Sequence, residues 1–374
     1  MPNITGEAYF NNGITVAGGG NEVLFGLLSD VANQKDIMRD FETNMEKMGY
    51  VNQIAQSKDE KFTQIAPPEE MDDLVEDGVK PELESEKMPN KGYLVKEYGN
   101  KIKISKLMRK WLERNEYIGN ASSDVQAEFR QLFNGANNLI YSAKMRMAME
   151  MLKVWTKGFG EPTSEYGAGS PTPHGLPLFS VHHPFKRYSG EYRNMGSGAY
   201  LNAPLTADSL QDSLECFNTE IKGENGHGII TAKKSYKLFI SRKNLNNARR
   251  ILNATQSGTP SPWSGVGVNA NQTNQFIWNG NTVEIVVLEY LGDKDKYGNS
   301  IGSPSMRFVL NEEPMLITRA FRKIELRPLE LNNWMNEDTG SMFVGADCAK
   351  AFDHYGAEVA IFGSKGDGDT SYSY

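Results

Sequence analysis

Apolar side chains recur every three or four residues over an unusually long stretch of this chain, from Ser123 to Lys157. They are Val125, Phe129, Leu132, Phe133, Ala136, Ile140, Ala143, Met147, Met151 and Trp155. This spacing predicts one amphipathic helix, roughly 50 Å long at 1.5 Å per residue. A compact domain cannot surround such a rod, so we expect an elongated protein. Gly135 leaves open the alternative of two shorter core helices.

Charge and hydropathy narrow the class of protein. The chain has 374 residues and a formal net charge of -7, which argues against tight nucleic-acid binding through clustered Lys and Arg. No apolar run approaches the ~20 residues of a membrane span, and the start lacks the basic-then-apolar pattern of a secretory signal. We therefore expect synthesis in a cytoplasm and no membrane contact. Cys216 and Cys348 are expected to be reduced thiols.

Two short alternating runs precede the long helix and predict a β-hairpin. Tyr93–Tyr98 and Lys101–Ser105 flank Gly99-Asn100, a dipeptide suited to a tight turn. A lone two-stranded hairpin is marginal in water, so we expect it to rest on a neighbouring copy of the chain. The candidate contact residues on it are Tyr93, Tyr98, Lys101 and Lys103.

The remainder of the chain predicts alternating helices and strands. Thr206 is a candidate cap of a helix carrying Leu210 and Leu214, and a helix with Ala248 follows a strand over Tyr236–Ile240. Further strands are expected at Val283–Val287, Met306–Leu310, Met315–Phe321, Met342–Ala351 and Ala357–Phe362. The predicted fold class is α+β.

Motifs for catalysis, cofactors and metals do not stand out. His182-His183 invites a metal interpretation, but adjacent residues of extended backbone point to opposite faces and no carboxylate lies at ligand spacing. The Asp293 to Asn299 stretch resembles the start of a calcium loop, yet Pro304 stands where the bidentate carboxylate is needed. We predict no catalytic, cofactor-binding or metal-binding residues and a role other than an enzyme.

The order of elements from Leu178 onward resembles the Mu-type major head (capsid) proteins of tailed phages. Leu178–Pro184, with its Phe179 and His183-Pro184, leads through a Gly/Asn-rich bridge into the helix opening at Leu205-Thr206. A strand ending in Ser241 and a helix with Asn247-Ala248 follow, as in that family. The similarity covers Leu178–Leu291 and continues loosely to Phe362. The family has no obvious counterpart to the acidic stretch Glu69–Glu86.

The resemblance implies a Hong Kong 97-type capsid fold with a long spine helix. Its implied divisions are an N-terminal arm (1–57), an extended loop region (58–118), a peripheral domain with the spine helix (119–224), an axial domain (225–335), a peripheral return (336–364) and a flexible tail (365–374). The side chains implied to anchor the spine helix are Phe129, Phe133, Ile140, Met147 and Trp155.

The resemblance also implies partners and a location. The chain would assemble with itself into hexameric and pentameric capsomers, in the virion, around double-stranded DNA that it binds without sequence specificity. Portal, scaffolding and decoration proteins are the implied further partners. Three alternatives stay open: an encapsulin-like cargo compartment, a soluble enzyme, and another virion part such as a tail tube.

Overall fold

A computed structural model describes residues 46–62, 91–106, 123–184, 190–221, 235–253, 282–312, 319–335 and 338–370. Side chains of residues 123–137, in the first half of the long helix, lie outside this description. The helices are α5 (Ser123–Thr156), α6 (Ala207–Glu215) and α7 (Leu245–Asn253), with short helical turns at Gly198–Tyr200, Cys216–Glu220, Arg242–Asn244 and Ala357–Val359. The strands are β1 (Tyr50–Ile54), β2 (Asp59–Phe62), β3 (Lys91–Leu94), β4 (Lys96–Ile104), β5 (His183–Pro184), β6 (Glu191–Tyr192), β7 (Ser235–Ile240), β8 (Thr282–Val287), β9 (Arg307–Asn311), β10 (Phe321–Met335), β11 (Met342–His354) and β12 (Ile361–Ser364).

The chain divides into two compact units, which we call unit 1 and unit 2. Unit 1 comprises Met1–Glu42, Val95–Ala148 and Glu325–Lys350, and unit 2 comprises Thr43–Leu94, Met149–Ile324 and Ala351–Tyr374. Three elements, α5, β10 and β11, have residues in both units.

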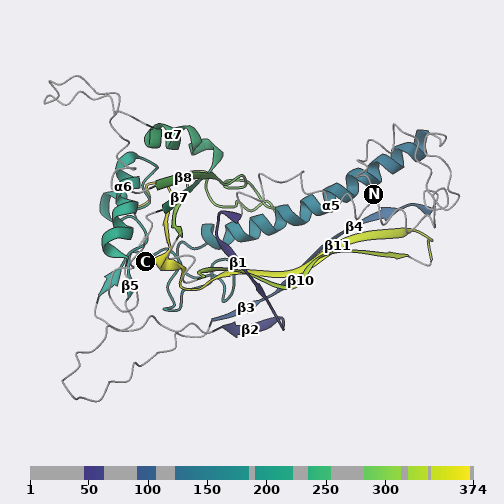
Figure 1. Ribbon diagram of the computed structural model, residues 1–374, viewed down its shortest axis with the longest axis horizontal. Coiled ribbons are helices and arrows are strands. Elements are labelled where there is room, and N and C mark those ends of the chain that lie inside the picture. The colour runs from purple at the N-terminus through teal and green to yellow at the C-terminus, as the bar shows by residue number, and fades with distance from the viewer. Residues whose placement is uncertain are drawn as a thin grey trace, which may run out of the picture. The chain divides into compact units, whose positions relative to one another are not determined.

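Unit 2 is built on the sheet β12-β9-β7-β8 (Figure 1). β7 runs parallel to β8 and antiparallel to β9, and β9 runs antiparallel to β12. Apolar side chains of α6 and α7 form one buried cluster with one face of β7, represented by Leu210, Ala248 and Leu238. The alternation of β7 sends Phe239 to the opposite face, where it meets Trp155 of α5. The sheet of unit 2 is thus covered on both faces.

The beginning of α6 follows from local sequence. The Thr206 hydroxyl accepts a hydrogen bond from the Ser209 amide at 3.1 Å, and the Ser209 hydroxyl accepts one from the Thr206 amide at 3.0 Å. This reciprocal pair satisfies two amides that the first helical turn leaves without partners. The predicted cap at Thr206 is confirmed.

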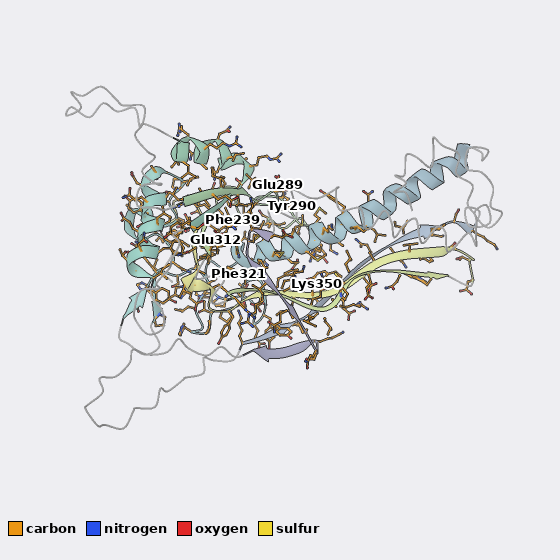
Figure 2. All side chains as sticks on the ribbon, in the orientation of Figure 1. Phe239, Glu289, Tyr290, Glu312, Phe321 and Lys350 are labelled. Atoms are coloured by element: carbon orange, nitrogen blue, oxygen red, sulfur yellow. The ribbon has the colours of Figure 1, made fainter. Side chains whose placement is uncertain are left out.

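The long helix is a single element. α5 runs from Ser123 to Thr156 without a break at Gly135, so the prediction of one continuous helix is confirmed and that of two shorter helices is wrong. Its last turns lie in unit 2, where Trp155 is 0% exposed. The Trp155 ring lies 5.0 Å from Phe239, 5.3 Å from Phe308 and 5.4 Å from Phe321 between centroids. Figure 2 labels Phe239 and Phe321 in this cluster.

The hairpin predicted around Gly99-Asn100 is wrong. β4 runs straight through both residues and pairs antiparallel with β11, from Lys96 opposite Lys350 to Ile104 opposite Met342. Neither Gly99 nor Asn100 has the positive φ of a tight hairpin turn. A Cβ on Gly99 would lie 3.3 Å from Cβ of Asp347, so the glycine permits close approach of two strands. The sequence predicted that Tyr93–Tyr98 would pair with Lys101–Ser105 nearby. The actual partner of β4 is β11, which lies far along the chain.

The buried cluster of unit 2 draws on three of the implied domain divisions. It joins Leu210 (expected peripheral), Leu238 (expected axial) and Phe362 (expected return) in one core. The division into peripheral and axial domains remains a proposal.

The last described residues are held by Asn202. Its side-chain carbonyl accepts from the Lys365 amide at 3.2 Å, its amide group donates to the Asp369 carbonyl at 2.9 Å, and its backbone carbonyl accepts from Gly368 at 2.8 Å. Residues 365–370 are therefore tied to the body of unit 2, which corrects the expected start of a flexible tail at 365. Residues 371–374 of that tail lie outside the described part.

The predicted N-terminal arm (1–57) is described from residue 46 onward, and the predicted extended loop region (58–118) at 58–62 and 91–106. Their remaining residues lie outside the description. In the part of the chain that is described, no helix combines the length and apolarity needed to cross a membrane.

Candidate functional site

One face of β4 in unit 1 brings two of the predicted contact residues together with two aromatic rings. Lys101 and Lys103 are exposed on alternate positions of β4. The Lys101 ammonium nitrogen lies 4.9 Å from the ring centroid of Phe343 on β11 and 5.9 Å from that of Trp334 on β10. The two rings stack with centroids 5.7 Å apart. We call Lys101, Lys103, Trp334 and Phe343 the Trp334 face.

Gly345 makes room for the ring of Trp334. A Cβ at Gly345 would lie 2.9 Å from the indole, closer than carbon atoms pack. The six-membered ring of the indole therefore approaches the backbone of β11 at Gly345, beside the ring of Phe343. Trp334 is still 43% exposed, so this face presents a fixed aromatic surface to its surroundings.

The neighbouring carboxylate on this face is already neutralised. Asp347 accepts from the Arg327 guanidinium at 2.7 Å and from the Asn332 amide at 2.5 Å. Lys101 and Lys103, in contrast to Asp347, make no ion pair with any described residue. The end of the sheet nearest Trp334 is consequently the basic end.

The opposite face of β4 is turned toward α5 within unit 1. Tyr98 is half-buried, and the Arg146 guanidinium lies 5.7 Å from its ring centroid. The Asn100 amide donates to the Ser142 hydroxyl at 2.8 Å. Tyr98 thus contacts the helix of its own chain, while Lys101 and Lys103 lie on the other face.

The fourth predicted contact residue, Tyr93, is on β3 in unit 2 and is 1% exposed. Its ring belongs to the interior of the subunit, which narrows the proposed contact set to Tyr98, Lys101 and Lys103. Of the predicted helix-anchoring residues, Trp155 is fully buried, and Ile140 and Met147 are half-buried. The side chains of Phe129 and Phe133 lie outside the described residues.

A buried polar cluster in unit 2 was not predicted. The Lys91 ammonium contacts the Asp353 carboxylate at 2.8 Å, and it donates to the Ser170 hydroxyl at 2.9 Å and to the His354 carbonyl at 2.6 Å. Asp353 also accepts from the Gly167 amide at 2.9 Å. Lys91 is 8% exposed and Asp353 is 1% exposed. Burial lowers the pKa of Lys91, and the nearby Asp353 carboxylate opposes that shift.

This cluster joins distant segments and is arranged to hold them together. All three ammonium donors of Lys91 have acceptors, which compensates the cost of burying the charge. The cluster fastens the start of β3 to the end of β11 and to the loop containing Ser170. Sequence reasoning missed it because its members are scattered along the chain, with no short-range spacing to reveal them.

The two adjacent histidines have different surroundings. His182 is exposed and its Nδ1 lies 2.7 Å from the Glu191 carboxylate. His183 is 0% exposed, and its Nε2 lies 3.2 Å from the side-chain carbonyl of Asn194. Burial lowers the pKa of His183 to about 4. The pair therefore points apart, as the extended backbone predicted, and Asn194 explains why a histidine is accommodated in the core.

The stretch resembling a calcium loop is closed by a lysine. One Asp295 oxygen accepts from the Tyr297 and Asn299 amides at 2.9 and 3.0 Å, and the other contacts Lys153 of α5 at 3.0 Å. The Lys153 contact holds the pKa of Asp295 at about 2. Across the described residues, no group of three or more His, Cys, Asp and Glu side chains is placed to hold a metal ion.

Comparisons with known proteins give distant structural similarities. No family model matches the chain, and no curated protein matches it. The capsid of an empty GTA particle is similar with a TM-score of 0.45 and 9% identity, over 86% of this chain and 89% of that one. The capsid of Ralstonia phage GP4 gives 0.45 and 8%, over 82% of each chain. A virus-like particle from Pyrococcus furiosus gives 0.40 and 9%, over 92% and 98%. These similarities are too distant to assign the chain to a family.

Proposed function

We propose that this chain is the major capsid protein of a tailed phage, which assembles with copies of itself into an icosahedral head around double-stranded DNA. The observation that carries the proposal is the incomplete burial of the sheet in unit 1. Eight of the nine residues of β4 are exposed or half-exposed. Such an exposed strand is expected in a protein whose neighbouring copies cover it on assembly.

The long helix supports the same proposal. The 26 residues of α5 in unit 1 (123–148) extend for roughly 39 Å, and the described strands beside them are β4, β10 and β11. One helix can cover one face of a sheet, so the Trp334 face needs another partner to become buried. A layer one helix and one sheet thick is suited to a wall built from many copies.

The resemblance of the sequence to major head proteins supports a closed head with hexameric and pentameric capsomers. It also supports the arm, extended loop, spine helix, peripheral and axial domains as the parts of the subunit. On this proposal the protein works in the virion without enzymatic activity, and portal, scaffolding and decoration proteins are its further partners. Its acidic net charge of -7 suits a container past whose wall DNA must slide during packaging.

Electron microscopy of negatively stained protein, expressed alone and fractionated by size, tests the proposal. Closed shells, or rings of five and six subunits, are the expected result. If the chain alone gives only small particles, the experiment is repeated with a co-expressed scaffolding protein. Dispersed subunits under both conditions would overturn the proposal.

The second candidate is an encapsulin-like compartment, which would give similar shells in that experiment. The two are separated by what native particles contain after nuclease treatment. A phage head protects double-stranded DNA of one uniform length, whereas a compartment yields a cargo protein and no protected genome. The long stretch of sequence that precedes β3, which includes the acidic residues of Glu69–Glu86, favours a phage head over a compartment.

A further inference from the structure

The Trp334 face has the properties of a contact surface with a chemical preference. It combines a 43% exposed indole, a stacked phenyl ring and two exposed ammonium groups on one side of a rigid sheet. Trp residues are enriched at the centres of protein interfaces, and charged groups around them select partners of the opposite charge. Because Asp347 is engaged by Arg327 and Asn332, the cations near Trp334 are left to attract an acidic partner.

The chain itself contains a segment with the matching chemistry. Residues Glu69–Glu86 carry nine acidic side chains and one lysine, together with the apolar Leu74, Val75 and Leu83. Carboxylates would complement Lys101 and Lys103, and the apolar side chains would cover the indole. This segment lies outside the described residues, between β2 and β3.

The described residues fix where that segment begins and ends. Phe62 at the end of β2 pairs with Lys91 at the start of β3, so both ends of the intervening 28 residues (63–90) meet at one place. Lys91 is held there by Asp353, Ser170 and the His354 carbonyl. From a closed base of this kind, 28 residues can reach at most about 45 Å out before returning.

The proposed function favours a neighbouring copy as the recipient. The side of β4 that carries Tyr98 and Asn100 contacts α5 of its own chain. The Trp334 face is the other side of the strand, and in a shell of many copies a neighbouring subunit can cover it.

We propose that the acidic segment Glu69–Glu86 of one copy docks on the Trp334 face of an adjacent copy. The contact is electrostatic at Lys101 and Lys103 and apolar at Trp334. It rests on the proposed function, because it forms between assembled subunits. It gives the segment that has no counterpart in major head proteins a role in joining copies.

Zero-length cross-linking of shells assembled from mixed isotope-labelled and unlabelled subunits tests the contact directly. A carbodiimide joins lysine amines to carboxylates, and mass spectrometry identifies the linked peptides. Links from Lys101 or Lys103 to residues 69–86 in peptide pairs of mixed label are expected. Links in same-label pairs alone would place the segment on its own chain and overturn the proposal, as would intact shells without these links. Failure to form any shell would overturn the proposed function as well.

Charge exchange provides a second test. In the variant Lys101→Glu/Lys103→Glu we expect the assembled fraction to fall by about tenfold or more, because like charges placed opposite each other at a contact repel. Adding Glu82→Lys, Glu84→Lys and Glu86→Lys should restore assembly. Lys96→Glu is the matched control, since Lys96 is exposed on the opposite side of the same strand.

Each outcome of the exchange is informative. Thermal unfolding of dissociated subunits shows whether Lys101→Glu has damaged the fold. If it has, Lys103→Glu alone is tested, because the Lys101 ammonium lies over the rings of Phe343 and Trp334 and the Lys103 ammonium does not. Equal loss in the Lys96→Glu control, or no rescue by the three reversed glutamates in a folded variant, would overturn the proposal.

Discussion

Among the described residues, the two four-stranded sheets, β12-β9-β7-β8 and β1-β10-β11-β4, differ in how fully their strands are buried. In unit 2 every residue of β9 and β12 is buried, because helices and the end of α5 cover the sheet. In unit 1 one residue of β4 is buried, at Ile104. The first sheet is buried within the subunit, and on the proposed function the second becomes buried by contact with other copies. Changes in unit 2 should therefore lower the stability of the subunit, and changes on the outer face of unit 1 should lower assembly.

Replacing Trp155 by Ala should have the largest effect on stability. The side chain is fully buried and touches three aromatic rings, so we expect a loss of about 3–5 kcal/mol in the free energy of unfolding. Urea denaturation of dissociated subunits measures it. Tyr297→Ala is the control, because Tyr297 is an aromatic residue of unit 2 that is 69% exposed. Similar losses of unfolding free energy in both variants would contradict the conclusion that Trp155 lies in a well-packed core of unit 2.

Replacing Lys91 by Met should destabilise unit 2 nearly as much. The change leaves the Asp353 carboxylate buried without its cation, which costs about 3–5 kcal/mol where a buried pair is broken on one side. Arg242→Ala is the control, because it breaks an ion pair with Glu289 whose side chains are 77% and 36% exposed, a kind typically worth less than about 1 kcal/mol. The double variant Lys91→Met/Asp353→Asn should recover part of the loss. No recovery would mean that the cluster is held by packing and not by charge.

Acid should weaken unit 2 through its buried histidines. Burial lowers the pKa of His183 to about 4, and the nearby His174 lowers it further while the Asn194 hydrogen bond opposes the shift. The unfolded chain takes up a proton near pH 6.5 while the folded chain does not. Stability is therefore fully present above about pH 6.5 and falls by about 3 kcal/mol as the pH drops to about 4.

The measurement is the urea midpoint of dissociated subunits between pH 7.5 and 4. His183→Gln should flatten its pH dependence, since glutamine keeps an amide for Asn194 and does not titrate. His354, whose pKa burial and the adjacent Lys91 lower to about 3, would account for the slope that remains. An unchanged slope in His183→Gln would contradict the assignment.

Replacing Trp334 by Ala should have the smallest effect on the subunit. The indole is partly exposed, so losing its stack with Phe343 and its contact with Lys101 should cost about 1 kcal/mol. Assembly should nevertheless decline, because the aromatic part of the contact is removed. Light scattering during assembly measures the second effect, with Tyr200→Ala, a 39% exposed aromatic of unit 2, as the control. A large loss of subunit stability would show that Trp334 is packed within its own subunit and does not await a partner.

The sequence predicted elements whose signal is local. The periodicity of α5, the Thr206 cap and the alternation in β7 and β8 each lie within one segment. β4 was misread as a hairpin because its partner, β11, lies more than two hundred residues further along the chain. The sequence analysis also placed no strand over residues 322–335, the greater part of β10, in which Pro328 is a residue that strand interiors disfavour.

The candidate site was predicted in part for the same reason. Lys101 and Lys103 could be named because they alternate on one strand. Trp334 and Phe343 reach the same face through the pairing of β10 and β11, which no spacing in the sequence indicates. The cluster of Lys91, Ser170 and Asp353 was out of reach altogether, because three separate loops and strands must fold before its members meet.

The pairing of Phe62 with Lys91 has a consequence for a subunit that has been cut. A peptide bond broken between residues 63 and 90 would divide the chain into two polypeptides without separating them. The pairing of β2 with β3, the pairing of β1 with β10 and the hydrogen bond from the Tyr50 hydroxyl to the Met151 carbonyl would keep both pieces in place. Such a subunit would run as two fragments in a denaturing gel and as one body under native conditions. A shell built from such subunits would look unchanged in the electron microscope, and the cleavage would be detected only from the masses of the two fragments.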